Sequence, residues 1–144
     1  MFETIIVALD SSPESKRAFA SAIRLTLVLG SELHAVTICE SSPVSASSVR
    51  AVAPTLVQTL VSDQKDYAAQ RLAEARVMAG RHGIDLTTHL VEGHAVDSII
   101  SCANNCKADL LVLGIHQQSL YVARLWSSAS QLALDSPCCV LGVN

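Results

Sequence analysis

Aromatic side chains are scarce in this sequence, since Phe, Tyr and Trp make up 3% of its 144 residues. Few rings are therefore available to stack on nucleic acid bases. Basic residues are not in excess either, because ten Lys and Arg stand against 13 Asp and Glu and give a formal net charge of −3. A protein that binds nucleic acid is expected to carry a basic footprint, so we expect no nucleic acid partner.

Long hydrophobic runs are also missing. No apolar run approaches the ~20 residues that a membrane-spanning helix needs. The N-terminal segment leads into a short apolar run that Asp10 ends, which is unlike a secretory signal peptide. We therefore expect a cytoplasmic protein with no membrane partner.

The cysteines lack the spacing of a zinc site or a disulfide framework. Their number is odd, they form no C-x-x-C pair and no histidine cluster accompanies them, so no bound metal is expected. Cys102 and Cys106 share one helix face, where either apolar packing or a redox pair would fit, and packing is favoured. The cysteines are Cys39, Cys102, Cys106, Cys138 and Cys139.

Aliphatic segments are abundant, because half of the residues are hydrophobic. Residues 4–9 and 110–113 are continuous apolar runs, typical of strands buried on both faces of a parallel sheet. Residues 31–39 are rich in β-branched side chains and predict a second strand. Residues 83–92 alternate apolar and polar side chains, which indicates an edge strand, and residues 138–143 predict a terminal strand.

Helical patterns separate these strands. Ser12 and Pro13 are typical N-cap and first-turn residues for a helix that runs to about residue 29, where Gly30 is suited to end it. Residues 40–53 are Ser-, Val- and Ala-rich and are expected to form a surface loop or a short irregular helix. The 3.6-residue period predicts further helices over residues 54–80 or 54–83, 95–106 and about 127–135.

The alternation of strands and helices predicts an α/β fold in one domain spanning residues 1–144. Right-handed crossovers place helices on both faces of a doubly wound, Rossmann-like, five-stranded parallel sheet. We expect the strand order 3-2-1-4-5, because the two most apolar strands then lie inside. The loops that follow residues 9 and 113 would face each other across one crevice, where ligands of such sheets bind.

Four segments resemble one known family in their order and spacing. They are Ile5-Ile-Val-Ala-Leu-Asp-Ser-Ser-Pro-Glu-Ser15, Val91-Glu-Gly93, Asp109-Leu-Leu-Val-Leu-Gly114 and Ser136-Pro-Cys-Cys-Val-Leu-Gly-Val143. In the last segment, Cys139 stands in place of a second proline. With these segments the whole chain resembles the universal stress protein family.

The resemblance directs attention to the loop after the fourth strand. In nucleotide-binding members this loop reads Gly, two residues, Gly, nine residues, Gly, then Ser or Thr, and its backbone N–H groups approach the phosphates. Gly114 matches the first glycine, and Gln117 replaces the second. Counting back from the closing segment, Trp126 replaces the third glycine and Ser127 follows it. Counting forward from Gln117, Ser127 replaces the third glycine and Ser128 supplies the hydroxyl.

Three further residues are candidate nucleotide contacts. The resemblance implies that Asp10 contacts the adenosine portion and that Thr37 touches adenine. The residues themselves also allow a plainer interpretation, in which Asp10 braces the turn before the first helix and Thr37 packs within its strand. His116 lies in the crevice loop, but a lone loop histidine without a visible partner is more typical of a solvated side chain.

Two features favour protein contacts. Trp126, the single tryptophan, either packs over the altered loop or anchors a protein partner whose identity is unknown. The terminal strand is an apolar edge that can pair with its own copy, and the resemblance implies the same homodimer. The residues of this expected dimer edge are Cys139, Val140, Leu141 and Val143.

These observations predict a non-enzymatic, homodimeric stress-response regulator that does not bind ATP in the usual way and needs no cofactor. The alternative is an adenine-nucleotide-binding protein that holds ATP in the crevice between the first and fourth strands. A slow nucleotide phosphatase is the third interpretation. It ranks last because the sequence shows no catalytic base, metal cluster or nucleophile pair.

Overall fold

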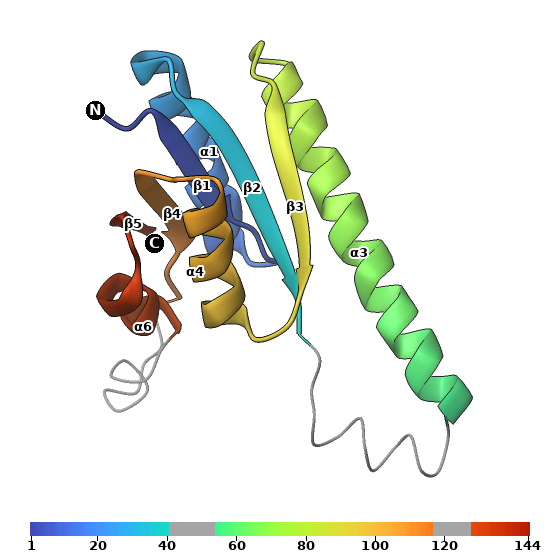
Figure 1. Ribbon diagram of the computed structural model, residues 1–144. Helices are drawn as coiled ribbons and strands as arrows, with labels where there is room; N and C mark the ends of the chain where they lie inside the picture. The colour runs from blue at the N-terminus through green and yellow to red at the C-terminus, as the bar shows by residue number, and fades with distance from the viewer. Residues whose placement is uncertain (41–53, 117–127) are drawn as a thin grey trace.

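Five parallel strands form one sheet at the centre of the molecule (Figure 1). They are β1 (Thr4–Ala8), β2 (Glu32–Cys39), β3 (Leu86–Glu92), β4 (Leu110–Gly114) and β5 (Cys139–Val143). The order is β3-β2-β1-β4-β5, which confirms the predicted topology. The computed structural model describes residues 1–40, 54–116 and 128–144, so the expected loop over residues 41–53 lies outside the described residues.

Helices cover both faces of the sheet, as predicted (Figure 1). The helices α1 (Pro13–Leu29) and α3 (Pro54–Gly80) pack on one face, and α4 (Ala95–Asn105) and α6 (Ser128–Asp135) pack on the other. In β1, Ile5 faces the first pair of helices and Ile6 the second, because successive side chains of a strand point to opposite faces. Within the described residues, no helix is long and apolar enough to cross a membrane.

The two central strands are buried as their apolar runs predict. The side chains of Ile6 in β1 and of Leu111 and Val112 in β4 have no exposed surface. The edge strand β3 is wetter, since Thr87 and Glu92 are exposed. Burial on both faces therefore places β1 and β4 side by side in the middle of the sheet.

The bounds of α1 follow from local chemistry. Ser12 has an extended backbone and its hydroxyl oxygen accepts a hydrogen bond from the Ser15 N–H, as an N-cap does. At the other end Gly30 has φ +70°, a left-handed conformation that favours glycine, and its N–H donates to the carbonyl of Thr26. Both predicted ends of this helix are confirmed.

Gly114 lets the end of β4 lie directly against the first turn of α1. A Cβ atom on this residue would stand 2.6 Å from the backbone nitrogen of Ser15 and 2.7 Å from the carbonyl carbon of Glu14. Backbone atoms at these distances leave no room for a methyl group. The absence of a side chain at Gly114 therefore sets how closely β4 and α1 approach.

Replacing Gly114 by Ala should lower the free energy of unfolding by about 1–3 kcal/mol, because the added methyl group must displace backbone atoms. Gly80→Ala is the control: its Cβ meets nothing within 4 Å, and it should be neutral or stabilise the protein by up to ~1 kcal/mol. Urea unfolding followed by circular dichroism measures both. A Gly114→Ala variant as stable as the parent protein would contradict the close approach.

Candidate functional site

The turn between β1 and α1 is closed by three side-chain hydrogen bonds. The Ser12 N–H donates to Asp10 Oδ1 at 2.7 Å, and the Ser15 N–H donates to Ser12 Oγ at 3.0 Å. The Asp10 N–H in turn donates to Ser15 Oγ at 2.9 Å. Asp10 therefore braces this turn, which is the plainer of its two expected roles.

His116 connects the end of β4 to the start of α1, at the carboxyl ends of the strands where the sequence analysis expects a crevice. Its Nδ1 lies 3.0 Å from Glu14 Oε2, and its Nε2 lies 3.8 Å from Asp10 Oδ2. Sequence reasoning found no partner for this histidine, whereas the fold supplies two carboxylates. The signal was present in the topology, because the loops after β1 and β4 were expected to face each other.

Glu14 is a crevice residue that the sequence analysis did not select. Its carboxylate also contacts Arg17, with 3.2 Å between Oε1 and the guanidinium. A hydrogen bond from its own backbone N–H lowers the pKa of Glu14; partial burial opposes this, and His116 and Arg17 lower it further. Glu14 is thus held in its charged form at the positive end of the helix dipole.

The N–H groups at the start of α1 are already engaged. Pro13 has no N–H, and Glu14 directs its own N–H to its carboxylate. The Ser15 N–H is taken by Ser12 Oγ, and the Lys16 N–H donates to the Ser12 carbonyl. A helix N-terminus can bind an anion through free N–H groups, but here an anion would have to displace these bonds.

Thr37 lies at the same end of the sheet, on β2. Its side chain is 1% exposed, and its hydroxyl donates to the Leu9 carbonyl at 3.2 Å. Leu9 also donates its N–H to the carbonyl of Val36. Thr37 therefore ties β2 to the residue that follows β1, which fits the packing role weighed in the sequence analysis.

The structure describes only part of the loop that distinguishes nucleotide-binding relatives. Gln117, Trp126 and Ser127 lie outside the described residues, and Ser128 is the exposed first residue of α6. At the start of the loop, the Ile115 N–H donates to the Val143 carbonyl at 2.7 Å and continues the pairing of β4 with β5. Across residues 1–40, 54–116 and 128–144, no group of three or more His, Cys, Asp or Glu side chains could hold a metal ion.

Cys102 on α4 and Cys106 at its C-terminal end pack against the core. Cys102 is buried in the cluster beneath α4, and Cys106 packs against that cluster. Burial, with a smaller contribution from Cys106, raises the pKa of Cys102 to about 11. Burial also raises the pKa of Cys106. Because the thiolate is the reactive form, these protonated thiols support the packing interpretation over a redox pair.

A second polar cluster lies away from the crevice and was not anticipated. His34 on β2 and His89 on β3 share a hydrogen bond, with 3.0 Å between Nδ1 and Nε2. They line a cavity of about 640 Å³ beside α4. The sequence signal for this pair was weak, because the two histidines are 55 residues apart and meet only through strand pairing.

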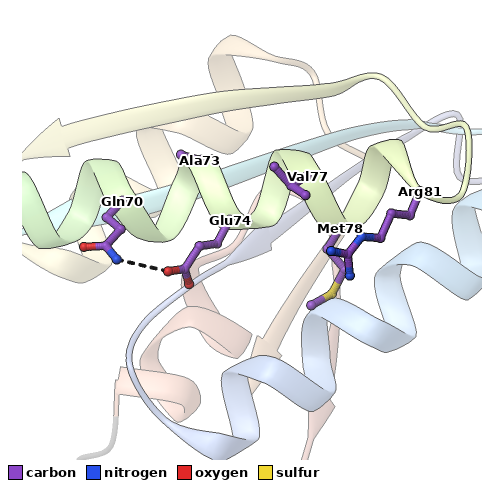
Figure 2. A pocket seen from close by; sticks show the side chains of 6 residues that line it. All are labelled: Gln70, Ala73, Glu74, Val77, Met78 and Arg81. Carbon is purple, nitrogen blue, oxygen red and sulfur yellow. Dashed lines mark hydrogen bonds between the residues drawn. The ribbon is translucent and has the colours of Figure 1, made fainter.

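A hollow of about 440 Å³ lies on α3 (Figure 2). Its lining includes Gln70, whose side-chain amide donates to Glu74 Oε1 at 3.2 Å, and Arg81 just beyond the helix end. Arg81 shortly precedes β3, so this hollow extends toward the amino ends of the strands. The crevice is at the carboxyl ends, and the two are therefore separate features.

Comparison with known proteins identifies the family of this fold and crevice. The model of the Universal stress protein family matches residues 1–144. Stress response protein NhaX of Bacillus subtilis (strain 168) is 27% identical over 151 residues, which cover 90% of this chain and 89% of that protein.

Solved structures agree with this assignment. Universal stress protein UspA from Lactobacillus plantarum has a TM-score of 0.80 at 21% identity, with 98% of this chain and 97% of that chain covered. A universal stress protein in complex with cAMP has a TM-score of 0.75 at 26% identity, with 99% and 97% covered. The family resemblance of the four sequence segments is confirmed, and this chain belongs to the universal stress protein family.

Proposed function

We propose that this protein is a non-enzymatic, cytoplasmic stress-response regulator that works as a homodimer through protein contacts and does not bind ATP in the usual way. The observation that carries this proposal is the occupied N-terminus of α1. Ser12, Asp10 and Ser15 satisfy one another across the turn. A triphosphate at this place would have to displace the hydrogen bonds of the Asp10, Ser12 and Ser15 N–H groups.

Charge in the crevice supports the same proposal. The carboxylates of Asp10 and Glu14 lie on either side of His116, so an approaching phosphate meets two negative groups and one imidazole that is already engaged. Gly114, the one retained glycine of the loop, is needed for packing against α1. Its presence is therefore explained without a nucleotide.

Adenine nucleotide binding is the second candidate. It is favoured by the crevice at the switch point between β1 and β4, and by the cAMP bound to a relative of 26% identity. Asp10 Oδ2 and the imidazole of His116 would be the polar contacts offered here, with Thr37 deeper in the sheet. A nucleotide that relies on base and ribose contacts would demand less of the α1 N-terminus than a triphosphate would.

A phosphatase remains the third candidate and has less support. The Ser12 and Ser15 hydroxyls nearest the crevice both take part in the hydrogen bonds that cap α1. Neither is positioned beside His116 by any contact in the described part of the chain. A serine nucleophile would need a base within hydrogen-bond reach.

Titration of the purified protein with ATP tests the leading proposal. We expect no saturable heat in calorimetry and no change in Trp126 fluorescence at sub-millimolar ATP, and no phosphate release. Gln117→Gly restores one glycine of the loop and should strengthen ATP binding if the lost glycines are responsible.

Three results would redirect the proposal. Saturable sub-millimolar binding of ATP by the parent protein contradicts it. Binding of cAMP without ATP supports the second candidate, and steady phosphate release supports the third. An Asp10→Ala variant then separates crevice binding from binding elsewhere, because only crevice binding should weaken.

The proposed dimer uses the outer edge of β5. This strand pairs with β4 on one side only in the described sheet, and Cys139 and Leu141 are exposed. An apolar strand edge with unpaired backbone groups is suited to pair with a second copy. Arg17 on α1 donates from Nε to the Asn144 carbonyl at 2.9 Å, which holds the end of the chain beside this edge.

A charge at this edge should dissociate the dimer. Leu141→Lys places an ammonium group where two copies would meet, and we expect sedimentation to shift from dimer to monomer with an unchanged far-ultraviolet spectrum. Val28→Lys is the matched control, because Val28 is 81% exposed and belongs to α1 rather than to the strand edge. A Leu141→Lys protein that sediments as the parent does would contradict the proposed interface.

A further inference from the structure

The histidine pair between β2 and β3 has the geometry of a shared proton. His34 and His89 both point to the face of the sheet that α4 covers in part, and the strand register places His89 opposite Val36, diagonal to His34. The two rings are nearly parallel, at 8°, with centroids 5.3 Å apart. If two rings meet edge to edge, their centroids are separated by the distance between the facing nitrogens, here 3.0 Å, plus about half a ring on each side. The observed separation fits this arrangement, so the two rings share an N–H···N hydrogen bond.

Proton counting shows when this bond is lost. In the neutral pair, one of the two facing nitrogens carries the hydrogen and the other accepts it. One added proton can occupy an outer nitrogen, which leaves the shared bond intact. A second added proton leaves both facing nitrogens as N–H donors, and two positive rings then repel each other at hydrogen-bond distance.

We propose that the His34–His89 pair is an acid-sensitive latch that ties β3 to β2 near neutral pH and opens the α4 side of this strand pair when both imidazoles are protonated. The cavity of about 640 Å³ beside the pair gives the separated rings a place to turn without unfolding the sheet. The latch is independent of the crevice and of the proposed function, because the polar contacts of the two histidines in the described part of the chain are with each other and with Glu32.

Several charged and titratable groups surround the histidine pair. On β2, Glu32 Oε2 lies 4.0 Å from His34 Nε2, the ring nitrogen that faces away from His89. Glu92 of β3 and Asp97 of α4 also line the cavity. Glu92 forms an ion pair with Lys65 of α3, and Asp97 Oδ2 lies 3.6 Å from His94 Nδ1. Cys102 of α4 and Cys106 directly after it also line the cavity, and burial keeps both thiols uncharged at neutral pH by raising their pKa.

The direction of the pH effect follows from linkage. Burial lowers the pKa of His89, and the neighbouring charge of His34 lowers it further. The unfolded chain therefore binds more protons than the folded chain between the ordinary value of 6.5 and the lowered folded value. The stability that the neutral pair contributes is therefore complete above pH 6.5 and is lost as the pH falls from 6.5 through the lowered pKa of His89.

Titration of the intact protein tests the latch. Melting temperatures measured from about pH 7.5 to about pH 5.5, either side of the ordinary imidazole pKa, should fall in the parent protein. In His89→Gln the fall should be reduced to roughly half or less, since the amide can bond to His34 without gaining charge. His82→Gln removes an exposed histidine and should keep the parent dependence.

Nitrogen-15 NMR of the imidazoles gives a second measurement that needs no variant. One ring should gain a proton while the shared N–H···N bond persists, and the other should titrate at a lower pH together with faster amide exchange in β3, after correction for intrinsic rates. Two rings that titrate together near the ordinary value would overturn the proposal. The same pH dependence in His89→Gln as in the parent protein would also overturn it.

Discussion

The close contact between β4 and the first turn of α1 is the constraint on which the crevice depends. Gly114 has no side chain, so the end of β4 reaches within van der Waals distance of the backbone at Glu14 and Ser15. Two residues later, His116 is therefore within reach of Glu14 and Asp10. A larger residue at Gly114 would part the strand from the helix and separate the imidazole from its carboxylates.

The turn between β1 and α1 limits what this end of the sheet offers to a ligand. In an open parallel sheet, the helix that follows a central strand normally presents free N–H groups at this place. Here the turn satisfies its own donors through Ser12, Asp10 and Ser15, and its charged groups are paired across the crevice. An anion at the N-terminus of α1 must compete with hydrogen bonds that the folded protein already makes.

Much of the site could be expected from local pattern, and the rest could not. Ser12 as N-cap, Gly30 as the helix end and the central position of β1 and β4 follow from capping chemistry and from uninterrupted apolar runs. The partners of His116 did not follow, because Glu14 is 102 positions away and only the crossover topology joins them. The replacement of two loop glycines by Gln117 and Trp126, and its effect on nucleotide binding, stays a prediction from sequence.

By itself, the sequence determined the fold class, the strand order and the family, because periodicity, caps and four ordered segments act locally or in chain order. The tertiary structure decided which polar groups meet. The pair of His34 with His89 depends on strand register, and the ion pair of His116 with Glu14 depends on a packing distance. Neither register nor packing distance is encoded in residues that are neighbours in the chain, so both appear only when the sheet and its helices assemble.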